Sequence, residues 1–156
     1  MNANIQNRIE KVRLALQTDS DGILTGWVNP PLEEVPESLQ GFSELAEFFQ
    51  VANGACCGEV VLFEGERLTE NQFIGESLPG GCSRWLWFGI ASNSPIIFDC
   101  ETQLVSEADP NGASELLRCF GTVDEFLLGL FSTKYLVVAG LECSRWYDLL
   151  DSLELT

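Results

Sequence analysis

Carboxylates are the most abundant chemically capable side chains in this sequence. The 156 residues include 24 Asp and Glu, 8 Lys and Arg, and no histidine. Three close pairs stand out: Glu33 and Glu34, Glu64 and Glu66, and Asp99 and Glu101. Two carboxyl groups are enough for the acid and base of a glycoside hydrolase. In a chain this acidic such pairs arise by chance, and no pair is marked as buried or perturbed, so we favour a non-catalytic protein over an enzyme.

The other reactive side chains offer little more. Without histidine the chain cannot form a Ser-His-Asp or Cys-His nucleophile system, and it lacks the commonest metal ligand. Six cysteines are present: Cys56, Cys57, Cys82, Cys100, Cys119 and Cys143. None are paired at the spacing of two to four residues that is usual in zinc sites. We therefore expect no metal and no cofactor. An N-terminus without a charged-then-apolar signal segment favours a reduced, cytoplasmic protein.

The net charge limits the kinds of partner. At −16, with an isoelectric point near 4.1, the surface repels nucleic-acid phosphates and anionic membranes and attracts basic proteins. No apolar run reaches the roughly 20 residues of a membrane-spanning helix. The charge alone does not distinguish a surface that binds a basic partner from one that only keeps the protein soluble.

The elements that would position these side chains centre on residues 85–101, WLWFGIASNSPIIFDCE. Two apolar runs flank a Ser-Asn-Ser-Pro turn, which predicts an antiparallel hairpin. Alternation sorts the side chains into two faces: Leu86, Phe88, Ile90, Ile96, Phe98 and Cys100 on one, and Trp85, Trp87, Gly89, Ala91, Ile97, Asp99 and Glu101 on the other. The wholly apolar first face is predicted to lie in the hydrophobic core. The tryptophans of the second are either core beneath a helix or an aromatic anchor for a partner, ringed by Asp99, Glu101 and Glu107.

Periodicity places helices at both ends of the chain and strands between them. We expect helices over residues 4–17, 38–52, 122–131 and 146–153, and strands over 23–28, 59–64 and 104–109 besides the hairpin. Asn53-Gly54 predicts a helix stop, and Thr122-Val123-Asp124-Glu125 predicts a capping box. The chain is expected to form a single domain, residues 1–156, of the α+β class, with a mainly antiparallel meandering sheet packed against helices.

Residues 36–131 resemble the SUKH superfamily. The resemblance rests on a helix that ends in Asn53-Gly54 before a strand, a strand led by Trp85, a hairpin into Phe98-Asp99, and the late FGTVDEFL segment, residues 120–127. The superfamily includes bacterial toxin-immunity proteins, Syd-like proteins and a yeast regulator of cell-wall synthesis. It implies an α+β fold without enzymatic activity and, for most bacterial members, neutralisation of a secreted polymorphic toxin that is frequently a nuclease.

The leading hypothesis is thus a non-catalytic immunity protein that binds a basic toxin domain. A nuclease site is basic because it grips phosphate, and an acidic inhibitor can mimic that ligand. The alternatives are a cytosolic regulatory scaffold that docks on another protein and an enzyme that uses carboxylates or thiols. The expected partner contacts are Glu64, Glu66, Trp87, Asp99, Glu101 and Glu107.

Overall fold

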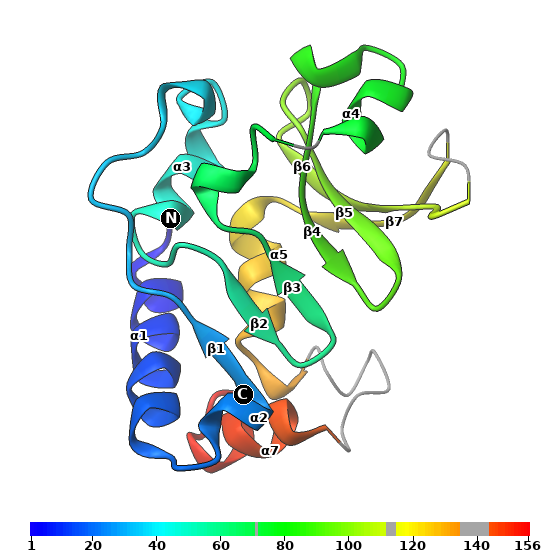
Figure 1. Cartoon of the computed structure of the whole chain (residues 1–156). Coiled ribbons are helices and arrows are strands. Elements are labelled where there is room, and N and C mark those ends of the chain that lie inside the picture. Colours follow the sequence, from blue (N-terminus) through cyan, green and yellow to red (C-terminus); the bar gives the residue numbers. More distant parts are fainter. Residues whose placement is uncertain (71, 112–114, 135–143) are drawn as a thin grey trace.

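The computed structural model describes residues 1–70, 72–111, 115–134 and 144–156. Its framework is a seven-stranded antiparallel sheet whose strand order in space, β1-β2-β3-β4-β5-β6-β7, is the order in the chain (Figure 1). The strands are β1 (Gly26–Val28), β2 (Ala55–Cys57), β3 (Val60–Leu62), β4 (Trp85–Ala91), β5 (Ser94–Asp99), β6 (Leu104–Ala108) and β7 (Leu116–Gly121). The predicted α+β class with a meandering antiparallel sheet is confirmed.

The helices match the predicted ranges only in part, since residues 22–25 are helical where a strand over 23–28 was expected. They are α1 (Ala3–Thr18), α2 (Gly22–Thr25), α3 (Ser43–Phe49), α4 (Phe73–Ser77), α5 (Val123–Leu130) and α7 (Arg145–Ser152). The capping box before α5 is present, with the Thr122 side chain accepting from the Glu125 amide and Glu125 accepting from the Thr122 amide. The predicted helix 38–52 is shorter at both ends. A separate 3₁₀ turn occupies Glu37–Leu39 and Gly41 precedes α3, which ends at Phe49, before the predicted stop at Asn53-Gly54.

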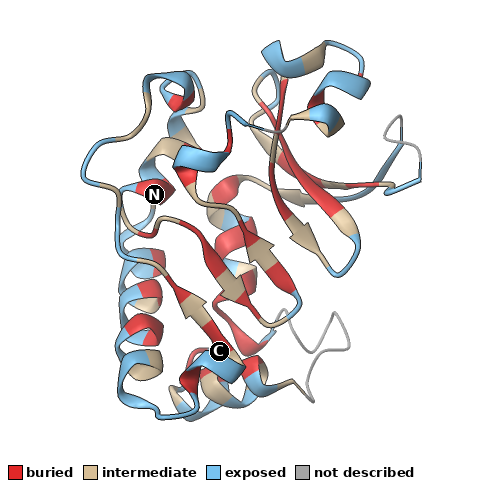
Figure 2. Ribbon diagram, viewed as in Figure 1, coloured by how far each residue is buried: buried red, intermediate tan, exposed pale blue. Residues whose placement is uncertain are grey.

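Most of the core lies on one face of the sheet, beneath α1, α3, α5 and α7. In Figure 2 the buried segments of α5 and α1 face the strands. Ile96, Phe98 and Val105 of the sheet are fully buried there, together with Ile9 of α1 and Leu127 of α5. A second, smaller cluster lies on the other face, beside α4. It consists of Leu78, Trp85, Ile97 and Ala108, with Ile74 and Trp87 packed against it.

A β-bulge in β4 changes the predicted alternation. Trp87 pairs with Ile97, but Gly89 pairs with Ile96, so Phe88 is the extra residue. Beyond the bulge Ile90 pairs with Pro95 and lies on the face of Trp87, where it is only half-buried. The expectation that Ile90 shares the core face with Leu86 and Phe88 is therefore wrong, because it assumed strict alternation through a strand that contains an extra residue.

Candidate functional site

The face of the sheet opposite the main core carries an uncovered apolar row. The pairing register sets Trp27 of β1 beside Cys56 of β2, Cys56 beside Val61 of β3, and Val61 beside Ile90 of β4. Directly opposed residues of antiparallel strands point to the same side, so these four side chains share one face. All four are half-buried, whereas their strand neighbours Val28, Ala55 and Leu62 are buried in the core.

Three aromatic rings continue this row toward α4. The ring of Trp87 lies 5.3 Å from that of Phe63 and 5.0 Å from that of Phe73, both in T-shaped contact. The indole Nε1 of Trp87 donates to the carbonyl of Gly89 at 2.8 Å, which fixes the orientation of the ring. Phe73 is exposed at 53%. Trp87 is thus a pre-oriented aromatic side chain with one part of its surface open to solvent.

A glutamine clamp holds the backbone of Trp87. The Gln72 side chain accepts from the Trp87 amide at 2.8 Å and donates to the Trp87 carbonyl at 2.8 Å, and its amide also donates to the Leu68 carbonyl at 2.7 Å. One side chain therefore replaces a missing strand partner at this point of β4. No sequence pattern singled out Gln72, because residues 67–81 show neither helical nor strand periodicity.

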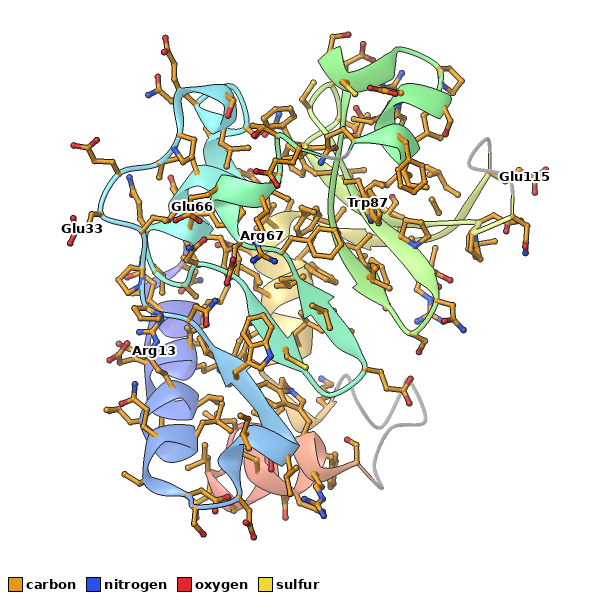
Figure 3. The ribbon with its side chains drawn as sticks, in the orientation of Figure 1. Arg13, Glu33, Glu66, Arg67, Trp87 and Glu115 are labelled. Carbon is orange, nitrogen blue, oxygen red and sulfur yellow. The ribbon has the colours of Figure 1, made fainter. Side chains whose placement is uncertain are left out.

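These residues enclose a cavity of about 360 Å³, which we call the aromatic groove. We call its apolar lining residues the floor and its polar lining residues the rim: the floor comprises Trp27, Val61, Leu62, Phe63 and Trp87, and the rim comprises Glu64, Arg67, Glu70 and Gln72. Figure 3 shows Arg67 and Trp87 near the centre of the view. The Arg67 side chain is 75% exposed and forms an ion pair with Glu64 at 3.2 Å. The groove combines an apolar floor with an acidic rim, in a volume typical of a small binding site.

A second concavity of about 610 Å³ adjoins the groove and shares Glu64 with it. We call it the acidic hollow. It is lined by Asn29, Pro30, Pro31, Leu32, Glu33, Glu34, Asn53, Glu64 and Glu66. Two asparagines orient its carboxylates: Asn29 Nδ2 donates to Glu64 Oε1 at 3.2 Å, and Asn53 Nδ2 donates to Glu66 Oε2 at 2.8 Å. The carboxylates of Glu33 and Glu34 are exposed on the segment that follows β1.

Buried Arg13 of α1 supports the acidic hollow from below. Its guanidinium donates to the carbonyl of Asn29 at 3.2 Å and to that of Val51, and it pairs with Glu10. Arg13 thereby ties α1 to the two segments that carry Asn29 and Asn53. The Asn53-Gly54 signal found part of this arrangement, since Gly54 has a φ of 83° that favours glycine. The role of Arg13 gave no sequence signal beyond a cation on an amphipathic helix.

Asp99 and Glu101, two of the expected contacts, lie in a different place. Arg84 donates to Asp99 from Nε at 3.0 Å and from its terminal nitrogen at 2.7 Å, and it pairs with Glu101 at 2.9 Å. The guanidinium carbon also lies 4.7 Å from the centroid of the Trp85 ring. Burial alone would raise the pKa of Asp99, but hydrogen bonds from Arg84 and the Glu101 amide outweigh it and hold that pKa below its usual value. Asp99 is buried and neutralised, so it offers no free carboxylate to a partner.

The expected site residues therefore do not form one surface. Glu64, Glu66 and Trp87 line the aromatic groove and the acidic hollow. Glu107 pairs with Ile96, which alternates with Ile97, so Glu107 lies on the face opposite Trp87, beside Arg118 of β7. Of the two hypotheses for the tryptophans, burial at 6% assigns Trp85 to the core. Trp87 stays open to the groove.

Burial raises the pKa of three of the described thiols, those of Cys56, Cys57 and Cys82. Five cysteines in the part of the chain that the structure describes are free, and Cys143 lies outside the described residues. Burial, followed by the neighbouring Cys56, raises the pKa of Cys57 well above its usual value, which keeps that thiol protonated. Among the described residues no three Cys, Asp or Glu side chains are grouped so that they could hold a metal ion. Nor does any described helix have the length and apolarity needed to cross a bilayer.

Comparison with known proteins leaves the surface as the main guide to function. No protein-family model matches the chain, and no curated protein matches it significantly.

Proposed function

We propose that this protein is a non-catalytic binding protein of the SUKH type, an immunity protein that neutralises a secreted toxin by covering a basic surface of the toxin domain. The observation that carries the proposal is the continuity of the aromatic groove and the acidic hollow through their shared residue Glu64. A half-buried aromatic anchor suits the centre of an interface, and the oriented carboxylates beside it suit the polar rim, where they complement a basic protein.

The architecture suits binding better than catalysis. Strands β1, β3 and β4 supply the floor of the groove, so it is rigid, while the segments after β1 and β3 supply the carboxylates. A site built on strands is pre-organised and loses little conformational entropy when a partner binds. The net charge of −16 extends the attraction beyond contact distance and would raise the rate of association with a cationic protein at low salt.

The test begins with the genes that flank the gene of this chain: the proposal requires a neighbouring gene for a secreted protein with a toxic C-terminal domain, and that domain is then the test partner. Co-expression of this protein should restore the growth of cells that produce the toxin domain. The Glu66→Lys variant should restore growth less well, because it places a cation in the acidic hollow. The matched control is Glu115→Lys, since Glu115 is also exposed but lies far from Glu66, immediately before β7 (Figure 3). The affinity of the purified pair should fall at least about tenfold between 50 and 500 mM NaCl.

Two results would contradict this function. If the wild-type protein neither relieves the growth inhibition nor forms a complex with the toxin domain, the toxin is not its partner. A regulatory scaffold is then the better hypothesis. Rescue lost equally with Glu66→Lys and Glu115→Lys would mean that total charge, rather than the acidic hollow, determines binding.

A further inference from the structure

The rim of the aromatic groove already contains one arginine of this chain. Arg67 is the only cationic side chain among the described residues that line the groove, and it meets Glu64 through a single Nε–Oε2 contact of 3.2 Å. Its side chain is 75% exposed. An ion pair this exposed contributes little stability, because water and salt screen it and two long side chains must be ordered to make it. Arg67 is therefore easily displaced.

The same face of the sheet shows how this protein holds a guanidinium group. Arg84 lies over the Trp85 ring while two carboxylates, Asp99 and Glu101, bind its nitrogens. The aromatic groove contains the corresponding parts without an equally well-held cation: the ring of Trp87, with the carboxylates of Glu64 and Glu70 on the rim. A guanidinium group stacks on aromatic rings and matches carboxylates with its fork of donors, whereas an ammonium group is more strongly hydrated.

We propose that the aromatic groove is a receptor for an arginine side chain of the protein partner, and that Arg67 is an internal competitor which the partner's arginine displaces from Glu64. The inference rests on the proposed function for the source of that arginine. The groove volume of about 360 Å³ suits one side chain rather than a folded segment. The apolar floor and the acidic rim then both contribute to binding, because the aliphatic part of the arginine packs on the rings while its guanidinium group contacts the carboxylates.

The test uses the whole protein labelled with ¹⁵N and the tripeptide Ac-Gly-Arg-Gly-NH₂, with the citrulline tripeptide as the neutral control of equal shape. At matched ionic strength, the arginine peptide should shift the indole signals of Trp27 and Trp87 in a saturable manner. The signals of buried Trp85 and Trp146 should not move. Equal shifts with the citrulline peptide, or shifts that never saturate, would overturn the inference.

Variants separate the groove from general charge. Arg67→Ala should tighten peptide binding by up to about fivefold, because it removes a competitor whose ion pair is weak. Arg67→Gln should act in the same direction. Glu64→Gln should weaken binding and Glu115→Gln should not. Unchanged affinity in both Arg67 variants, or equal losses in the two Glu variants, would overturn the competitor role.

The two proposals fail separately. If the toxin is neutralised but the arginine peptide does not shift the two indole signals, the immunity function stands and the arginine receptor is wrong. If the peptide binds as described but no toxin is neutralised, the receptor stands and its arginine belongs to a different protein partner.

Discussion

Arg84 shows how single residues on the sheet combine several interactions. Its guanidinium stacks on Trp85, forms two hydrogen bonds with Asp99 and one ion pair with Glu101. Hydrogen bonding to Asp99 is the main reason that the pKa of Arg84 is raised. The arrangement fixes the end of β5 against the turn that precedes β4, and it explains why a carboxylate can be buried at this position.

Asp99→Asn tests this arrangement at the residue scale. We expect a loss of about 1–3 kcal/mol in the free energy of unfolding at pH 7, because one bidentate partner of a partly exposed arginine is removed. The folded-state pKa of Asp99 is lowered, so its contribution is complete above the usual value of 3.8 and is lost as the pH falls through the lower folded value. Urea unfolding at pH 7 and at pH 2.5 should show the difference between the two proteins shrinking in acid. The exposed Glu101→Gln is the control, with a change within about 0.5 kcal/mol. A difference that is the same at both pH values would contradict the ion-pair explanation.

Sequence patterns also gave no prediction for the segment between β3 and β4. Gln72 and α4 dock this segment on β4, where Gln72 bonds both backbone groups of Trp87. The short α4 then places Phe73 and Ile74 over the sheet beside Trp87 and the smaller apolar cluster. The aromatic groove thus depends on a side chain that substitutes for a strand.

Gln72→Glu should disrupt this docking. A carboxylate can still accept from the Trp87 amide but cannot donate to the carbonyls of Trp87 and Leu68, which leaves two acceptors facing an anion. We expect a loss of about 2–3 kcal/mol in unfolding free energy and a displaced Trp87 indole signal in the ¹⁵N spectrum. Gln72→Ala removes all three hydrogen bonds but places no anion against the two carbonyls, and it should cost less. Wild-type stability and an unmoved Trp87 signal in Gln72→Glu would show that the clamp does not hold the groove.

The sequence patterns predicted the fold class, the meandering sheet and most of the elements, but not which side chains come together at the site. The capping box at Thr122 and the hairpin from Trp85 to Asp99 act within a few residues, so the sequence displays them directly, whereas the predicted stop at Asn53-Gly54 lies beyond the end of α3 at Phe49. Strands β2 and β7 were missed, since β2 has three residues and β7 is exposed along most of its length. Glu107 was placed on the wrong face because its position depends on pairing with Ile96 rather than on any local pattern. The site depends on the same long-range register and on the clamp by Gln72.

At the scale of the whole molecule, helices from opposite ends of the chain complete the core. Arg8 of α1 donates to the carbonyls of Phe131 and Thr156, and the Asn2 amide donates to Asp124 of α5. Trp146 of α7 is 1% exposed and donates to the Leu130 carbonyl. A Cβ atom added to Gly26 would lie 3.1 Å from the Trp146 ring. Helix α7 therefore packs closely on β1, although the two elements lie far apart in the sequence.

Every strand, by contrast, neighbours the strand that precedes it in the chain. The consequence is kinetic. Successive strands can join the sheet one at a time, each closing only the residues that separate it from the preceding strand, whereas docking of α7 on β1 must close most of the length of the chain. We expect Ile96→Val to slow refolding, with a φ-value of about 0.5–0.8, and Trp146→Phe mainly to speed unfolding, with a φ-value below about 0.3. Stopped-flow measurements of both variants decide between this sequence of events and one in which the two ends of the chain meet first.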